Sequence, residues 1–258
     1  MTQYRRLPLA TLHNARELGG YPIVGGGVTR HGVFVRCEAP CNLPESDLEF
    51  LRNYGLKLAV DFRGDREVNE RPSALLDLPW VEYKRSPTFN DAVAFASRNA
   101  ANNAPNAAPP VTSQVVWGEK YIDMAETCKE WIAETLTILA NADGCALFNC
   151  TTGKDRTGII AALLLSLAGV GDEDIVADYC VSEIYLTEVY RPLLEGYNKH
   201  FPNEHRAKLT DPFFRTVPEN MWILLDYLRD TYGGAAAYVA HCGVTDGTVA
   251  LLRSKLVV

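Results

Sequence analysis

A short stretch past the middle of the chain, residues 145–168, constrains the fold more than any other segment. It begins with the β-rich run Cys145–Asn149, continues through a polar loop and ends in a predicted helix at residues 157–168. That helix is apolar on every face, as expected of a helix packed in the middle of a domain. The stretch therefore predicts a buried strand, a tight loop and a central helix in direct succession.

Shorter patterns on both sides of this stretch extend the prediction to a whole domain. Strands are predicted at residues 33–37, 58–62 and 81–83, and helices at 44–54, 121–139, 172–186, 221–228 and 244–256. Strands separated by helices predict a single α/β domain over residues 1–258, with a mostly parallel central sheet flanked by helices and a helix-rich C-terminal half. Ala, Asn and Pro dominate residues 97–114, which predicts a flexible loop, either a lid or an idle surface loop.

Charge and hydropathy exclude several classes of partner. Lys and Arg total 25 against 32 Asp and Glu, so the net charge is −7 and a nucleic-acid partner is not expected. The longest apolar stretch, residues 159–170, is too short to span a bilayer, and no apolar core follows the basic N-terminus. We expect a cytoplasmic protein without stable membrane insertion, with export lacking a recognisable signal peptide as the alternative. The oligomeric state stays open.

The seven cysteines favour reduced thiols over disulfides or a metal site. Their number is odd, and the closest pair, Cys37 and Cys41, has no histidine at ligand spacing. We therefore expect neither a metal nor another cofactor, and a reducing cellular setting.

The loop between the predicted strand and the central helix suits an oxyanion. Unpaired backbone N–H groups at a helix N-terminus point into such a loop, and the helix dipole adds partial positive charge. Gly153 lets the backbone close tightly, and Arg156 offers a planar fork that matches two phosphate oxygens. Cys150 is placed under these donors, where a thiolate nucleophile is favoured.

Two other interpretations account less well for this loop. A nucleotide-binding P-loop requires Gly and Ser or Thr at positions that hold Phe148 and Asp155 here. A buried inert thiol beside a charged helix start leaves unexplained why Cys, Gly, Lys, Arg and Thr-Gly occur together between a strand and a helix. The combination favours a functional loop.

The string Cys-Thr-Thr-Gly-Lys-Asp-Arg-Thr-Gly at residues 150–158 resembles the Cys-x5-Arg signature of cysteine-dependent phosphatases. With the motifs at residues 14–21 and 61–63, it is similar to the bacterial and fungal tyrosine-phosphatase-like branch, which includes mycobacterial and listerial enzymes. The resemblance implies the cysteine-phosphatase fold and a hydrolase acting on phosphotyrosine and/or phosphoinositides through a phosphocysteine. The partner would be a phosphorylated protein or a phosphoinositide.

The resemblance gives each residue of the loop an expected role. Cys150 would attack phosphorus, Arg156 would hold the phosphate oxygens, and Thr157 would ease departure of the sulfur in the second step. The expected phosphate-binding residues are Thr151, Thr152, Gly153, Lys154, Asp155, Arg156 and Thr157.

The leaving oxygen needs a proton from a nearby acid. Asp155 is the first candidate because the resembling branch has its acid in the loop, and an ion pair with a neighbouring cation is its alternative role. Asp61, at a predicted strand end, is the second candidate catalytic residue. Asp211 is the third.

Asn149 departs from the family pattern, because most members have His immediately before the nucleophile. Asn carries no titratable charge, so a catalytically weak phosphate-binding module is the alternative function. Lys154 is expected either in the phosphate pocket or as a solvated lysine. Arg16 and Arg63 are expected to brace the loop through a carboxylate such as Asp61 rather than to contact the substrate.

Overall fold

One five-stranded sheet organises the part of the chain that the computed structural model describes, residues 5–88, 117–200, 208–211 and 214–258. The strands are β1 (Arg16–Glu17), β2 (Phe34–Cys37), β3 (Leu56–Asp61), β4 (Glu82–Arg85) and β5 (Cys145–Asn149), in the spatial order β1-β2-β5-β3-β4. β1 is antiparallel to β2, and the other neighbours are parallel. The prediction of a mostly parallel central sheet is confirmed.

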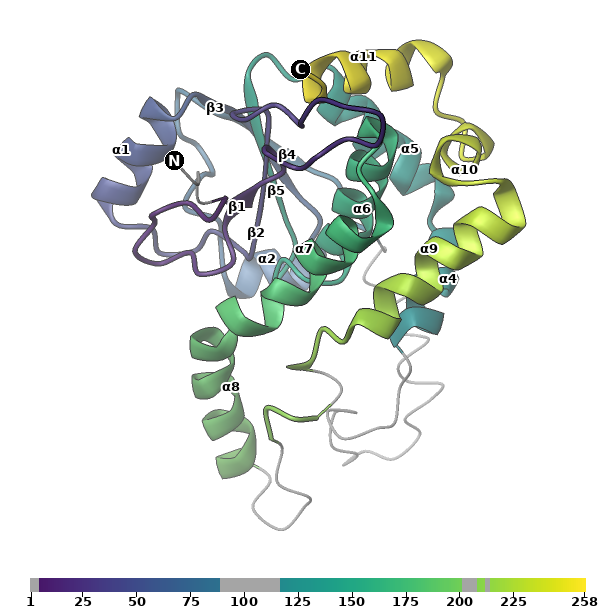
Figure 1. Ribbon diagram of the computed structural model, residues 1–258. Coiled ribbons are helices and arrows are strands. Elements are labelled where there is room, and N and C mark those ends of the chain that lie inside the picture. The colour runs from purple at the N-terminus through teal and green to yellow at the C-terminus, as the bar shows by residue number, and fades with distance from the viewer. Residues whose placement is uncertain (1–4, 89–116, 201–207, 212–213) are drawn as a thin grey trace.

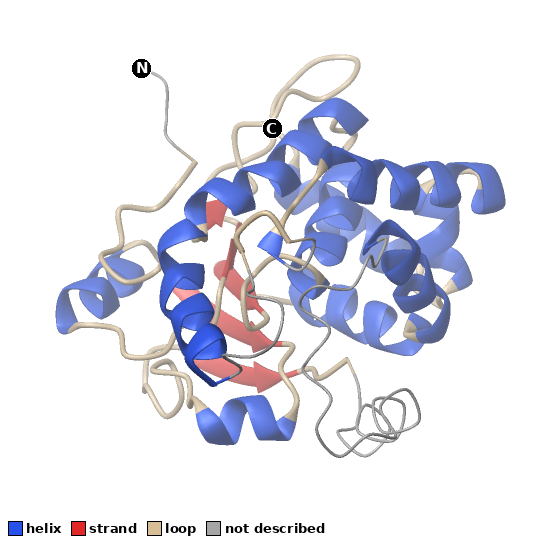
Figure 2. Cartoon of the chain, turned by 90° about the horizontal axis from the view of Figure 1, so that it is seen from below, coloured by secondary structure: helices blue, strands red, loops and turns tan. Residues whose placement is uncertain are grey.

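Helices lie on both sides of the sheet (Figure 2), and most of them belong to the C-terminal half (Figure 1). Their bounds are α1 (Glu45–Asn53), α2 (Asp65–Glu70), α4 (Trp117–Thr127), α5 (Lys129–Ala140), α6 (Arg156–Ala168), α7 (Asp172–Tyr185), α8 (Thr187–His200), α9 (Pro218–Tyr232), α10 (Ala235–His241) and α11 (Asp246–Leu256). The α/β class and the helix-rich C-terminal half are confirmed as well.

The two faces of the sheet enter two separate hydrophobic clusters. Along β5, Ala146 and Phe148 pack into the larger cluster, which contains residues of α4–α7 and α9–α11. Cys145 and Leu147 point to the other face, where Leu51 of α1 helps to form the smaller cluster. This alternation is the two-residue period of a strand that is covered on both faces.

α6 is the central helix that its sequence predicts. Every residue in it is buried except Arg156 and Ser166. The helix ends at Gly169, whose φ of 89° is the left-handed conformation that glycine adopts at helix C-termini. α6 contacts β2 and β5 of the sheet and packs against the helices α7, α10 and α11.

The single helix predicted at residues 121–139 is wrong. The chain leaves the helical conformation at Cys128 (φ −116°, ψ 32°), and α4 and α5 are separate helices. Trp131, just after the break, donates from Nε1 to the Ser86 carbonyl beyond β4 (2.8 Å). Neither Gly nor Pro marks the break, so tertiary contacts rather than local propensity decide it.

Other expectations are met only in part. The sequence analysis does not predict α2, α8 and α10: α2 and α10 are short, and α8 contains Pro192, a residue that disfavours a helix interior. The candidate lid at residues 97–114 lies outside the described residues. Within the described parts, no helix combines the length and apolar character needed to cross a membrane.

Candidate active site

The candidate site lies at the carboxyl ends of the parallel strands. Cys37, Asp61 and Asn149 lie side by side at the ends of β2, β3 and β5. Residues 150–155 form the loop that follows β5, and α6 begins at Arg156. Ligands of open α/β sheets bind in the crevice beyond this edge.

Cys150 occupies the buried start of the loop, and its side chain is only 2% exposed. Neighbouring strand ends hold the chain around it. The Phe62 N–H donates to the Asn149 carbonyl (2.8 Å), and the Ala39 N–H donates to the Thr151 carbonyl (3.1 Å). The position of the thiol is therefore determined by the sheet.

Gly153 makes the tight loop possible. Its φ of 68° lies in the left-handed region. A Cβ atom at this position would lie 2.3 Å from the Cys37 carbonyl oxygen and 2.6 Å from the Glu38 nitrogen. Only glycine fits, because both the backbone conformation and the close approach to β2 exclude a side chain.

The carbonyl groups of the loop are held from outside. Asn14 Nδ2 donates to the Thr152 carbonyl (3.1 Å) and, more weakly, to the Gly153 carbonyl (3.3 Å). Arg36 Nη2 donates to the Gly153 carbonyl (2.7 Å). In the described parts of the chain, no backbone N–H of residues 151–153 donates to a backbone carbonyl. Such successive unpaired N–H groups form a nest for an anion.

A buried network of charged side chains keeps Asn14 and Arg36 in position against the loop. Asp178 of α7 pairs with Arg16 (Nε to Oδ1, 2.8 Å) and with Arg36. Arg16 also donates to the Asn14 carbonyl (2.9 Å). Burial alone would raise the pKa of Asp178, but the two guanidinium groups hold that pKa well below its ordinary value. The bracing expected of Arg16 thus runs through Asn14 and Asp178, not through Asp61.

Asp61 sits in a different set of contacts. It is fully buried and pairs with Arg63 (Nη2 to Oδ2, 2.7 Å), so Arg63 braces this edge as expected. The Tyr83 hydroxyl (2.8 Å) and Asn149 Nδ2 (3.1 Å) also donate to its carboxylate. Both carboxylate oxygens are taken, which suits an anion that holds Asn149 in place better than a proton donor.

Arg156 is held by a carboxylate that the sequence patterns do not single out. Glu67 of α2 accepts from Nη1 (2.9 Å) and from Nη2 (2.8 Å), and it also accepts from the Thr151 hydroxyl. Burial alone would raise the pKa of Glu67, but Arg156 and Thr151 lower it to about 2. Proximity to the motif at residues 61–63 is the one sequence signal that points to Glu67.

Replacing Glu67 by Gln is expected to lower the free energy of unfolding at pH 7 by about 1 kcal/mol, a charged hydrogen-bond pair discounted for partial exposure. A carboxyl whose folded-state pKa is depressed stabilises the fold above its unfolded value, about 4.3, and loses this contribution as the pH falls toward 2. The difference between wild type and variant should therefore shrink between pH 5 and pH 2 in urea unfolding. Glu70→Gln, on the exposed face of the same helix, is the control. An equal difference at pH 7 and pH 3 would contradict the assignment.

Two buried polar atoms close to the loop lack hydrogen-bond partners among the described residues. One is Oδ1 of Asn149, directly before Cys150, and the other is Oγ1 of Thr157 in the first turn of α6. Buried unpaired polar atoms are rare and mark places where water, an ion or a ligand can bind. The Thr157 hydroxyl therefore keeps its hydrogen available to a group in the loop.

Asp155 lies at the other side of the loop and is partly exposed. Its Oδ1 accepts a hydrogen bond from the Tyr121 hydroxyl (2.6 Å). Oδ1 also lies 3.7 Å from Lys154 Nζ, so the ion pair considered as an alternative role is present but long. Tyr121 was predicted as a core residue of a helix, and its periodic spacing there conceals the contact with Asp155.

Lys154 is buried, with an exposed fraction of 2%. Its Nζ lies 5.2 Å from the centroid of the Trp117 ring, within the range of a cation–π interaction. The alternative of a solvated lysine does not agree with this burial. The lysine instead contributes positive charge close to the loop.

Asp211, the third candidate acid, lies in a short described segment. Its Oδ2 accepts from the Lys208 N–H (2.7 Å), which is a local turn contact. Within residues 208–211 and 214–258, the described contacts of Asp211 do not include the loop.

Burial raises the pKa of five cysteines outside the loop, Cys37, Cys128, Cys145, Cys180 and Cys242, and so favours the thiol there. All seven cysteines are free. Burial raises the pKa of Cys145 to about 12 and that of Cys180 to about 11. No three His, Cys, Asp or Glu side chains in the described parts of the chain gather where they could hold a metal ion.

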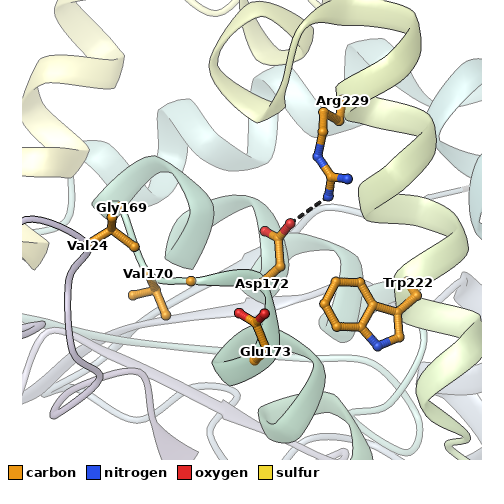
Figure 3. A pocket seen from close by; sticks show the side chains of 8 residues that line it. Val24, Gly169, Val170, Asp172, Glu173, Trp222 and Arg229 are labelled. Atoms are coloured by element: carbon orange, nitrogen blue, oxygen red, sulfur yellow. Dashed lines mark hydrogen bonds and ion pairs between the residues drawn. The ribbon is translucent and has the colours of Figure 1, made fainter.

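A surface pocket lies elsewhere, at the far end of α6 (Figure 3). Val24, Trp222 and the ion pair between Asp172 and Arg229 (2.6 Å) line it. α6 has 13 residues, so at ~1.5 Å per residue its two ends are about 18 Å apart. The pocket contains none of the predicted site residues and is separate from the loop at residues 150–155.

Comparison with known proteins finds relatives of this chain. The sequence model of a family described as "Tyrosine phosphatase family" matches residues 7–258. The chain is 33% identical over 177 residues to a candidate tyrosine-protein phosphatase of Cupriavidus necator, covering 68% of this chain and 62% of that protein. It is 29% identical to a tyrosine-protein phosphatase of Nostoc commune, covering 86% and 74%. It is 25% identical to the triple specificity protein phosphatase PtpB of Mycobacterium tuberculosis, covering 88% and 91%.

Proposed function

The chain belongs to the tyrosine phosphatase family, and from this premise we propose that it hydrolyses phosphotyrosine and/or phosphoinositides through a phosphocysteine on Cys150. One observation carries the proposal. Cys150 is buried at the start of a loop whose carbonyls are held from outside, and Arg156 stands at the other end of that loop. This arrangement supports the proposal that a thiol, a nest of N–H groups and a guanidinium together would hold one phosphate.

The phosphate would bind residues 151–157. Arg156 donates from Nη1 to Phe62 and Glu67, and from Nη2 to Glu67 and, at 3.3 Å, to Thr151. Nε and one Nη2 hydrogen are therefore the donors that a phosphate would take, the latter in place of the weak Thr151 contact. Glu67 keeps the guanidinium in one plane while the phosphate binds at its edge.

The reaction would proceed in two displacements. The Cys150 thiolate attacks phosphorus, the S–P bond forms, and the bond from phosphorus to the leaving oxygen breaks. Water then attacks phosphorus, the S–P bond breaks, and orthophosphate leaves. The loop N–H groups and Arg156 stabilise the equatorial oxygens in both steps. The unpaired Thr157 hydroxyl supports donation to the departing sulfur.

Asp155 is the acid that we propose for the leaving oxygen. It is partly exposed at the loop, whereas Asp61 is buried with both oxygens occupied. Asp61 would instead hold Asn149, and through it the start of the loop. This contact gives Asn149 a fixed position without the charge of the usual His.

The substrate class follows from a panel assay of the wild-type protein. Hydrolysis of a phosphotyrosine peptide and of a phosphoinositide, each dispersed at the same concentration, would be compared by phosphate release. A sample quenched with a denaturing detergent at alkaline pH after reaction with ³²P-labelled substrate should retain label on the protein as an S-phosphocysteine, which mild acid then releases. Binding of the peptide without phosphate release in either assay would favour the alternative function, a phosphate-binding module, which Asn149 in place of His suggests.

The free thiols also favour a reducing compartment such as the cytoplasm.

Asp155→Asn is expected to lower kcat/KM for substrates with poorly acidic leaving groups by roughly 10²- to 10³-fold, the usual contribution of a general acid. The fall in rate at high pH, which reports loss of the acidic proton, should disappear from the pH–rate profile. Asp211→Asn, at a partly exposed aspartate, is the control, and Asp61→Asn is measured beside it. A profile of Asp155→Asn that still falls at high pH would assign the acid to another residue.

A further inference from the structure

A line of hydrogen bonds runs from the helical half of the domain to Asp155. Asn220 Nδ2 of α9 reaches the Tyr179 hydroxyl of α7 (3.4 Å), and the Tyr179 and Tyr121 hydroxyls lie 2.7 Å apart. The Tyr121 hydroxyl of α4 then donates to Asp155 Oδ1 (2.6 Å). All three residues behind Asp155 are 5% exposed or less. None of them lies in the signature loop.

The direction of every bond in this line is determined. Asn220 Oδ1 accepts from the Gly118 N–H (3.3 Å), which orients the amide and leaves Nδ2 to donate to Tyr179. A phenol has one hydrogen. Because Tyr121 uses its hydrogen for Asp155, Tyr179 must donate to Tyr121. All the donors therefore point toward Asp155.

The line acts on one oxygen of Asp155 only. Oδ1 accepts from Tyr121 and is also the atom nearest Lys154 Nζ. Among the described residues, Oδ2 has no hydrogen bond or ion pair. An oxygen that already accepts a short hydrogen bond is a poor site for a proton, so the acidic proton belongs on Oδ2.

We propose that Tyr121 is a positioning residue that holds Oδ1 of Asp155 and thereby presents Oδ2 as the proton-bearing oxygen, an inference that rests on the proposed function. In the first displacement the proton moves from Oδ2 to the leaving oxygen as its bond to phosphorus breaks. The new negative charge on Asp155 is met at Oδ1 by the Tyr121 hydrogen. In the second displacement the attacking water returns a proton to Oδ2, so the cycle closes.

The surroundings of Tyr121 keep its hydroxyl hydrogen in place over the pH range of the assay. Burial raises the pKa of Tyr121 well above its ordinary value, and burial likewise raises the pKa of Tyr179. Both phenols therefore stay protonated. The other titratable or charged groups around Asp155 are Lys154 and Arg156 of the loop and helix start, and Tyr190 of α8.

The test is Tyr121→Phe, assayed with two aryl phosphates, one with a strongly acidic leaving phenol and one with a weakly acidic one. We expect kcat/KM for the weakly acidic leaving group to fall about ten- to fiftyfold, and that for the strongly acidic one less than about threefold, because only the former needs the proton. The ratio of the two kcat/KM values is the readout that a merely structural loss would not change.

Tyr238→Phe is the matched control. Its hydroxyl is equally buried and donates to the Ala125 carbonyl of the same helix α4 (2.6 Å), but it does not touch Asp155. The control should change kcat/KM for both substrates by the same factor and so leave their ratio as in wild type. Tyr179→Phe should reproduce the pattern of Tyr121→Phe at smaller size. If Tyr121→Phe no longer unfolds cooperatively, Tyr179→Phe tests the positioning role in its place with the same two aryl phosphates.

Asp155→Asn, measured in parallel, separates the two proposals. If Asp155→Asn discriminates between the leaving groups and the tyrosine variants do not, the positioning role of Tyr121 is overturned while the proposed acid stands. If Asp155→Asn does not discriminate either, the acid assignment fails and the inference fails with it.

Discussion

Replacing Cys150 by Ser is expected to reduce turnover of an aryl phosphate to background, a loss of at least ~10⁴-fold or about 5.4 kcal/mol in the activation barrier. A serine hydroxyl stays protonated at neutral pH and is a poor nucleophile without a base. In the described parts of the site, none of the side chains that contact the loop is a base next to position 150. The carbonyl contacts of Asn14 and Arg36 do not involve the thiol. The loop at residues 150–155 should therefore keep its conformation, and orthophosphate is expected to bind the variant within about threefold of wild type by calorimetry.

Cys242→Ser is the control for this result. Cys242 is a half-buried free thiol at the end of α10, and its replacement should leave turnover unchanged. Residual activity of Cys150→Ser above about one per cent of wild type would exclude Cys150 as the nucleophile. Equal absence of turnover in wild type and Cys150→Ser, with phosphate binding in both, would instead identify a binding module.

Gly153→Ala is expected to lower kcat/KM by roughly 10²- to 10³-fold, because a displacement of about 1 Å in a catalytic loop costs about 10² in rate. The new methyl group would meet the Cys37 carbonyl at 2.3 Å, so either the loop or the end of β2 must move. The left-handed φ of 68° adds a conformational cost of about 1–2 kcal/mol for a non-glycine residue. Stability should fall by about 2–4 kcal/mol in urea unfolding, clash and conformational cost together.

Gly233→Ala isolates the conformational part of that cost. Gly233 ends α9 with a φ of 85°, and a Cβ there would have nothing within 4 Å. This variant should lose about 1–2 kcal/mol of stability and keep its kcat/KM. If Gly153→Ala matched it in both measurements, the close packing of the loop against β2 would not matter for catalysis.

Much of the loop could be predicted from local sequence. The strand Cys145–Asn149 has the predicted bounds, and α6 begins one residue before its predicted start. A strand, a six-residue loop and a helix are consecutive in the chain, so their order and the placement of Gly153 and Arg156 follow from covalent connection and local conformational preference. For the same reason, the residue types of the loop are enough to predict its anion-binding chemistry.

The partners of these residues could not be predicted in this way. Glu67 lies 89 positions from Arg156, and Tyr121 lies 34 positions from Asp155. Tyr121 follows the helical period of a core residue, and its hydroxyl has no sequence signature. The break between α4 and α5 at Cys128 is equally invisible in the local pattern.

The sequence by itself determined the α/β class and predicted the loop at residues 150–155 with its thiol and guanidinium, because each follows from local patterns along the chain. Only the tertiary structure decided which carboxylate holds Arg156, which pair of arginines surrounds Asp178, and which oxygen of Asp155 is held by Tyr121. The physical reason is that a buried charge must find its partner within a few ångströms. Packing of the helices against the sheet brings that partner from any distance along the chain.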